Sequence, residues 1–151
     1  MFRSIVVGTD GSATASEAVH RAHELAGALS ADLHVVNAYR PPAVVLAATA
    51  EPGLGPSPVV EWEAAARHDA CRLLDEVAID LAGPVPVTTH AVAAHPATAI
   101  LSVAEAVDAD LIVVGNRGMQ GARRVLGSIP NHVSHHAGCD VLVVDTVHAT
   151  A

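Results

Sequence analysis

The sequence contains no lysine, and this absence excludes several kinds of site. All eight lysine-or-arginine positions are arginines. A P-loop nucleotide site and a Schiff-base enzyme both need a lysine amine, so neither mechanism fits this chain. The formal net charge is −8 at pH 7. This charge argues against a surface for nucleic acid or for an anionic membrane, because both partners are negatively charged.

Aromatic residues and cysteines are also scarce. Phe2, Tyr39 and Trp62 are the only residues of their kinds, so valine, leucine, isoleucine and alanine must form the core. Cys71 and Cys139 lie far apart and outside any Cys-x-x-Cys motif, which favours two reduced thiols over a disulfide. No apolar run approaches the roughly 18 residues of a membrane span, and the first residues do not resemble a secretory signal. We therefore expect a cytoplasmic protein with no membrane partner.

Short apolar strands alternate with amphipathic helices along the chain. We expect strands at residues 5–7, 33–38, 85–93, 111–114 and 141–144, with a helix in each interval between them. This order predicts one α/β domain, with a doubly wound parallel sheet covered by helices on both faces. We expect the domain to span residues 1–146, with a flexible tail at 147–151. Proline, glycine and alanine dominate residues 41–58, which predicts a surface loop.

The stretch 110–128 carries the features that favour an anion site. Its apolar strand leads into a loop whose glycines let backbone amides approach a ligand closely. Several arginines lie in the same loop, and a helix is expected to begin where the loop ends, which favours phosphate binding. The alternative is a glycine-rich turn that only reverses the chain. The residues concerned are Gly115, Arg117, Gly118, Gly121, Arg123, Arg124, Gly127 and Ser128.

A second polar loop, Gly-Thr-Asp-Gly-Ser at residues 8–12, follows the first strand. A carboxylate such as Asp10 at the end of a strand can accept hydrogen bonds from a ribose or hold a metal that bridges to phosphate. Asp10 can also cap the following helix, and the two roles are compatible. If the first and fourth strands are neighbours, both loops line one crevice at the carboxyl edge of the sheet.

These motifs resemble those of the universal stress protein family, and the resemblance covers essentially the whole chain. It rests on residues 5–12, 33–36 and 141–144, and most firmly on residues 110–118 with the later pair Gly127-Ser128. The resemblance implies a five-stranded sheet in the order 3-2-1-4-5. It also implies a homodimer through the last strand, which comprises Val141, Leu142, Val143 and Val144. An exposed apolar edge strand invites pairing in its own right, although the C-terminal tail can instead cover such an edge.

The resemblance to the ATP-binding branch of this family assigns ligand roles to individual positions. Asp10 would lie near the ribose and Mg²⁺, with Thr9 beside it, and Val35 would present backbone groups to the adenine. The positions that would lie along the ribose and the phosphates are Val114, Gly115, Arg117, Gly118, Gly127, Ser128 and Ile129.

Two departures from the family pattern are visible. Only eight residues separate Gly118 from Gly127, where the family has about nine, so the phosphate cradle would be tighter or shifted. Ala94 stands where many members have a glycine, which would narrow the pocket slightly. Neither departure removes a ligand group, so nucleotide binding remains the favoured interpretation.

Histidine is abundant, with ten residues. His132 and His136 are four residues apart on the last expected helix, a spacing that can share a metal. With His135 between them, they are more typical of a solvated or interfacial polar face. We expect His20 and His23 at the surface, and His34 to be partly buried with its hydrogen bonds satisfied.

Three functions agree with these motifs. The first is a regulator of stress adaptation that binds ATP, with cyclic AMP as the alternative nucleotide; its stress role is implied only by the resemblance. The second is a slow ATPase or phosphotransferase that uses Asp10 and a metal, although the sequence shows no positioned base. The third is a dimeric interaction module that binds no nucleotide.

Overall fold

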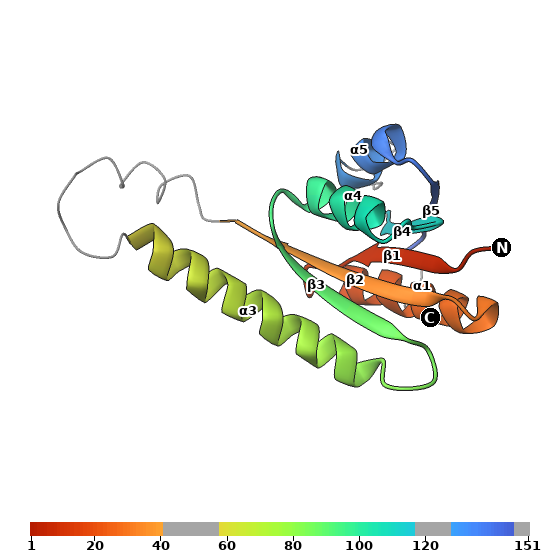
Figure 1. Ribbon diagram of the computed structural model, residues 1–151, viewed down its shortest axis with the longest axis horizontal. Coiled ribbons are helices and arrows are strands. Elements are labelled where there is room, and N and C mark those ends of the chain that lie inside the picture. Colours follow the sequence, from red (N-terminus) through yellow and green to blue (C-terminus); the bar gives the residue numbers. More distant parts are fainter. Residues whose placement is uncertain (41–57, 117–127, 147–151) are drawn as a thin grey trace.

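The structure is a computed structural model that describes residues 1–40, 58–116 and 128–146. Strands and helices alternate through these residues, as predicted (Figure 1). The strands are β1 (Ser4–Gly8), β2 (Asp32–Tyr39), β3 (Val87–Ala93), β4 (Leu111–Gly115) and β5 (Asp140–Val144). The helices are α1 (Ala13–Leu29), α3 (Pro58–Asp80), α4 (Pro96–Ala106) and α5 (Ser128–His136).

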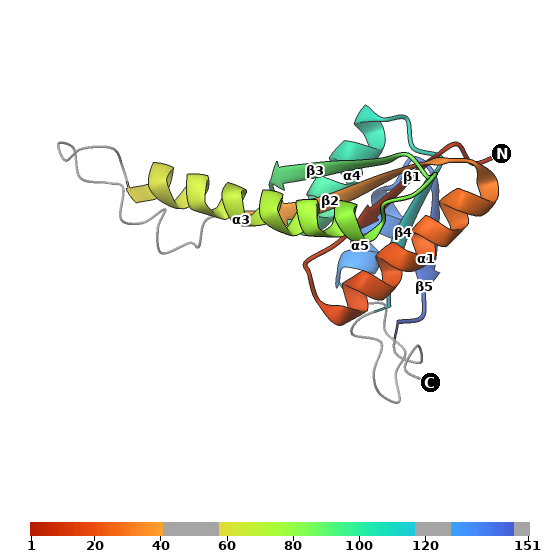
Figure 2. The same cartoon turned by 90° about the horizontal axis from the view of Figure 1, so that it is seen from below.

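The five strands form one parallel sheet in the order β3-β2-β1-β4-β5. This order confirms the predicted doubly wound fold. The chain moves outward from β1 to β3, returns to the other side of β1 at β4, and ends on β5 at the edge. Figure 2 shows α3 and α4 on opposite sides of β2 and β3, and the packing of the cores places α1 on the face of α3 and α5 on the face of α4. The reversal of strand order between β1 and β4 creates the crevice in which such sheets bind ligands.

Two hydrophobic cores lie on opposite faces of the sheet, because successive side chains of a strand point to opposite sides. Ile5 and Val7 of β1 pack in the core beneath α1 and α3, whereas Val6 between them packs in the core beneath α4 and α5. All three side chains are fully buried. Both cores consist of valine, leucine, isoleucine and alanine, as the composition required. Trp62 lies outside them near the start of α3 and is 41% exposed. Figure 1 shows that this end of α3 extends beyond the sheet.

Asp110 joins the amino-terminal ends of the neighbouring strands β1 and β4. Its Oδ2 accepts hydrogen bonds from the backbone nitrogens of Arg3 at 2.7 Å and Ser4 at 3.0 Å. These two bonds, the Arg3 bond first, hold the pKa of Asp110 below its ordinary value. The backbone nitrogen of Asp110 donates in turn to the Ser4 carbonyl at 2.9 Å. The start of β1 is therefore tied to the start of β4 at the edge opposite the crevice.

The histidines fulfil the expectations in part. His34 is half-buried and hydrogen-bonded to His90, as predicted. His20 is exposed and lies 3.0 Å from a carboxylate oxygen of Asp80. The expectation for His23 is wrong, because this side chain is half-buried and its Nε2 has no hydrogen-bond partner among the described residues.

Several expectations fall at the limits of the described chain. The loop expected at residues 41–58 lies outside the described residues apart from Pro58, where α3 begins. The expected tail at 147–151 lies outside them entirely. Cys71 and Cys139 are both free thiols. None of the described helices combines the length and the apolar character that crossing a membrane requires.

Candidate functional site

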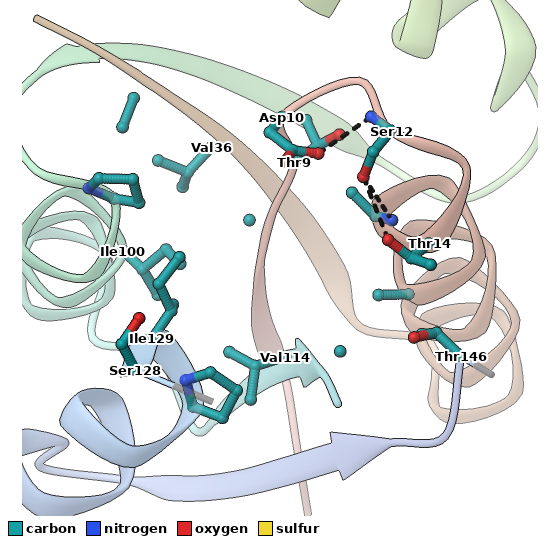
Figure 3. Close-up of a pocket in the computed structure, with 17 residues that line it drawn as sticks. Thr9, Asp10, Ser12, Thr14, Val36, Ile100, Val114, Ser128, Ile129 and Thr146 are labelled. Atoms are coloured by element: carbon teal, nitrogen blue, oxygen red, sulfur yellow. Dashed lines mark hydrogen bonds between the residues drawn. The ribbon is translucent and has the colours of Figure 1, made fainter. Parts of the chain in front are cut away.

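A cavity of about 440 Å³ opens where β1 and β4 end. Its volume lies in the range of small-molecule sites, roughly 300–1,000 Å³. Figure 3 shows its lining, which comes from the turn after β1, the ends of β2 and β4, and the first turns of α1, α4 and α5. The turn after β1 and the two described ends of the loop after β4, Gly115 and Ser128, line the same cavity, because β1 and β4 are paired neighbours with Val7 opposite Val113.

Thr9 forms the floor of the cavity at the end of β1. Its backbone nitrogen donates to the Val36 carbonyl at 2.8 Å, so hydrogen bonding between β1 and β2 continues past the last residue of β1. The Thr9 carbonyl accepts from Nδ2 of Asn37 at 2.7 Å. Thr9 and Asn37 are each 8% exposed. Asn37 was not singled out from the sequence, and it fixes the backbone that carries the next residue, Asp10.

Asp10 and Ser12 lie at the rim, in the turn that starts α1. Oδ1 of Asp10 accepts from the Ser12 nitrogen at 2.9 Å. The Ser12 hydroxyl accepts from the Ala15 nitrogen at 3.2 Å, which makes Ser12 the N-cap of α1. Gly11 between them has a φ of +79°, which is strained for other residues. The turn thus holds an exposed carboxylate and a serine hydroxyl at the mouth of the cavity (Figure 3).

The opposite wall comes from β4 and α5. Val114 is 5% exposed and presents its side chain to the cavity beside Gly115. Ser128 and Ile129 open α5 and also line the cavity, followed by Pro130. The first amides of a helix lack partners within the helix. Proline has no N–H, so Ser128 and Ile129 are the described residues of this turn that can offer amides to a ligand.

Asp10 is the only charged side chain among the described residues that line the cavity, and the other polar groups include several hydroxyls. One carboxylate together with phosphate oxygens and water is a common way to hold Mg²⁺, so Asp10 fits a metal that arrives with a phosphorylated ligand. A ready-made metal site is absent from the described part of the chain, where no three histidine, cysteine or acidic side chains converge.

The structure brings many of the predicted ligand residues to this cavity. Six of them line it: Thr9, Asp10, Val114, Gly115, Ser128 and Ile129. The side chain of Val35 is fully buried on the opposite face of the sheet, and its neighbour Val36 lines the cavity instead. The backbone role of Val35 stays a prediction. Ala94, expected to narrow the pocket, packs against the core beneath α4 and is not among the lining residues. Arg117, Gly118 and Gly127 lie outside the described residues, as do Gly121, Arg123 and Arg124.

Thr146 is a lining residue that the sequence did not indicate. It follows β5 by two residues, yet it is only 7% exposed and forms one wall of the cavity. Its backbone nitrogen and its hydroxyl both donate to Oδ1 of Asn116, each at 2.9 Å. A Cβ built on Gly115 would lie 3.2 Å from the Thr146 methyl group. The glycine at this position lets the two segments approach closely.

The family model for universal stress proteins matches residues 1–145 of this chain. The chain belongs to the universal stress protein family. A universal stress protein of Mycobacterium tuberculosis (strain H37Rv) is 36% identical to it over 152 residues, which cover 96% of this chain and 97% of the relative. The universal stress protein A homolog 1 of Coxiella burnetii is 31% identical over 144 residues, covering 95% and 96%.

Solved universal stress proteins have the same fold. One that was solved in complex with cAMP superposes with a TM-score of 0.67 at 31% identity, covering 96% of this chain and 98% of the other. UspA from Lactobacillus plantarum superposes with a TM-score of 0.74 at 25% identity, covering 95% and 97%. The family membership predicted from the sequence is thereby confirmed for this universal stress protein.

Proposed function

We propose that this universal stress protein is a cytoplasmic regulator of stress adaptation that binds an adenine nucleotide in the cavity at the ends of β1 and β4. The observation that carries the proposal is the convergence of the first turns of α1, α4 and α5 on that cavity. Each helix N-terminus carries a partial positive charge, and the first turn of α5 adds the amides of Ser128 and Ile129, which suit phosphate. A relative of 31% identity, solved with cAMP, supports the same class of ligand.

The lining divides into an apolar part and a polar part. Val36 and Ile100 offer apolar surface for a base or a sugar ring. Asp10 would accept hydrogen bonds from ribose hydroxyls. The Ser128 hydroxyl and the amides of Ser128 and Ile129 would donate to phosphate oxygens. Thr9, Val114 and Gly115 would lie against the ribose, Val35 would give backbone contacts to the adenine, and Arg117, Gly118 and Gly127 would complete the phosphate contacts.

ATP is the proposed nucleotide, and cyclic AMP is the alternative. Mg²⁺, when bound, would bridge Asp10 and phosphate oxygens and offset their negative charge. Because lysine is absent from the chain, phosphate binding would depend on backbone amides, Ser128 and arginine. The Asp10 carboxylate would otherwise repel a polyphosphate, so we expect ATP to need Mg²⁺ more than cyclic AMP does.

We also propose a homodimer through β5. This strand is at the edge of the sheet, so one row of its backbone hydrogen-bonding groups has no neighbouring strand within the described residues. Leu142 on β5 is 41% exposed, although it lies in an apolar strand. Antiparallel or parallel pairing with a second copy would satisfy the backbone groups and cover this leucine.

Calorimetric titration with ATP, with and without Mg²⁺, and with cyclic AMP tests the proposed function. Replacing Asp10 by Asn should weaken Mg²⁺–ATP binding by about tenfold, the effect of losing one charged contact. Asp75→Asn, which removes an exposed carboxylate from α3, is the charge-matched control and should bind as the wild type does. Absence of heat from both nucleotides would contradict the proposal and favour an interaction module that binds no nucleotide.

A further inference from the structure

One residue outside the cavity, Asn116, joins the segment after β4 to the segment after β5. Its backbone nitrogen donates to the Val144 carbonyl at 3.0 Å. Its Nδ2 donates to Oδ1 of Asp145 at 2.8 Å. Its Oδ1 accepts from both the nitrogen and the hydroxyl of Thr146, each at 2.9 Å. Four hydrogen bonds therefore hold three consecutive residues of the later segment against a single asparagine.

The amide side chain suits this place chemically. Asn116 must accept on one side and donate on the other, and an amide does both at once. A carboxylate would lose the donor and would face the Asp145 carboxylate with a like charge. A serine is too short to reach two segments. The hydrogen-bond pattern thus depends on the residue type as well as on the position.

The bonds to Asn116 decide what Thr146 can offer to a ligand. A threonine hydroxyl has one proton and two lone pairs. Since the proton is donated to Oδ1 of Asn116, the hydroxyl can only accept a further bond. Thr146 is then able to receive a ribose hydroxyl or an adenine amino group, and it is unable to donate to a phosphate oxygen. Figure 3 shows Thr146 on the other side of Val114 from Ser128 and Ile129, whose amides and hydroxyl can donate to a ligand.

We propose that Asn116 is a positioning residue of the nucleotide site, which acts by holding Thr146 as the wall that accepts hydrogen bonds from the nucleoside part of the ligand. This inference rests on the proposed function. Asn116 is not among the lining residues and acts through Thr146. By the same bonds it makes the end of the edge strand β5 part of the site, so ligand binding and the order of that strand end depend on one another.

The first test needs no ligand. Hydrogen exchange should show a protected Thr146 amide in the wild type, because that amide donates to Oδ1 of Asn116. In Asn116→Ala the same amide should exchange much faster, while amides in the centre of β1 keep their protection. Asn131→Ala, which removes an exposed asparagine from α5, is the matched control and should leave Thr146 protected. Equal protection of Thr146 in Asn116→Ala and in the wild type would overturn the inference.

The second test measures coupling in the binding of ATP. Asn116→Ala and Thr146→Val should each weaken binding, by about tenfold and about threefold respectively. The double variant should bind no more weakly than Asn116→Ala alone, because both changes remove the same wall. Full additivity, as independent structural damage would produce, contradicts a positioning role.

Thr146→Val keeps the shape of the side chain, so it remains informative if Asn116→Ala does not fold. The predicted loss of affinity in Thr146→Val should disappear when the nucleotide used as a probe lacks the group that donates a hydrogen bond to Thr146. The probes are 2′-deoxy-ATP, 3′-deoxy-ATP and purine riboside triphosphate, which lacks the amino group. If the wild type binds ATP and Thr146→Val binds it with the same affinity, this inference is overturned and the proposed function stands. Absence of binding by the wild type overturns the proposed function itself.

Discussion

The imidazole rings of His34 and His90 meet across β2 and β3, with Nδ1 of one 3.1 Å from Nε2 of the other. A hydrogen bond between two ring nitrogens needs one donor and one acceptor, so the pair is intact when the accepting ring is neutral. Burial lowers the pKa of both rings. The charge of Asp32 opposes this effect at His34, whereas His34 adds to it at His90.

The pair should make the stability of the domain depend on pH. A histidine whose pKa is lower in the folded state takes up protons more readily when unfolded, so its contribution is present above pH 6.5 and is lost as the pH falls below that value. We expect a loss of about 0.5 kcal/mol from this pair, because solvent screens half-buried rings. Urea unfolding of the wild type and of His90→Gln, from about pH 8 to pH 5, isolates the contribution of this histidine pair to stability. A variant with the wild-type pH dependence would contradict this assignment.

Gly8 lies beneath Ile100 of α4 at the floor of the cavity. A Cβ at residue 8 would lie 2.6 Å from Cδ1 and 3.1 Å from Cγ1 of Ile100, so the Ile100 side chain would have to shift. Gly8→Ala should lower the free energy of unfolding by about 1–3 kcal/mol through overpacking. Gly138→Ala is the matched control, since nothing lies within 4 Å of its Cβ. Denaturant unfolding should find the control within about 0.5 kcal/mol of the wild type; equal losses in both variants would refute the explanation.

The N-cap of α1 gives a separate prediction for stability. Ser12→Ala removes the oxygen that accepts from the Ala15 nitrogen, and it should cost about 1 kcal/mol. Ser12→Gly should cost only a few tenths of a kcal/mol, because glycine also serves as an N-cap. Urea unfolding without ligand compares the two. Alanine and glycine variants of equal stability would show that the cap contributes little here.

The proposed dimer predicts a change in mass. Leu142→Glu places a charge on the exposed side of the edge strand β5, and it should shift the protein from dimer to monomer in sedimentation velocity. Ile79→Glu is the matched control, because Ile79 is 77% exposed on α3 and far from β5 in sequence and topology. If Leu142→Glu sediments as the wild-type dimer does, the interface lies elsewhere.

The fold followed from local patterns that act over a few residues. Short apolar runs such as Leu111 to Gly115 are characteristic of strands buried on both faces, and alanine-rich periodic segments cover them. These patterns predicted the alternation of elements and the meeting of the Asp10 loop with Ser128. Asp10 was expected as a possible cap of α1, whereas the structure shows that Ser12 is the N-cap and that Asp10 accepts from the Ser12 nitrogen.

The remaining features depend on contacts that a local pattern does not contain. Val35 and Val36 are both apolar, so a continuous hydrophobic run gives no sign of which one faces the cavity. The place of Thr146 depends on Asn116, thirty residues earlier, and its own neighbours show no periodic signal. His23 looked like a surface residue because no local pattern indicates that its Nε2 is buried.

The cavity draws its walls from distant parts of the chain, with Thr9 near the beginning and Thr146 after the last strand. During synthesis on the ribosome, β1 to β4 can pair before β5 has emerged, since they precede it in the sequence. The nascent domain would then have most of its sheet and still lack one side of the binding cavity. A nucleotide that requires all the walls would bind only after translation has passed residue 146, so ligand occupancy would mark a domain whose edge strand is in place.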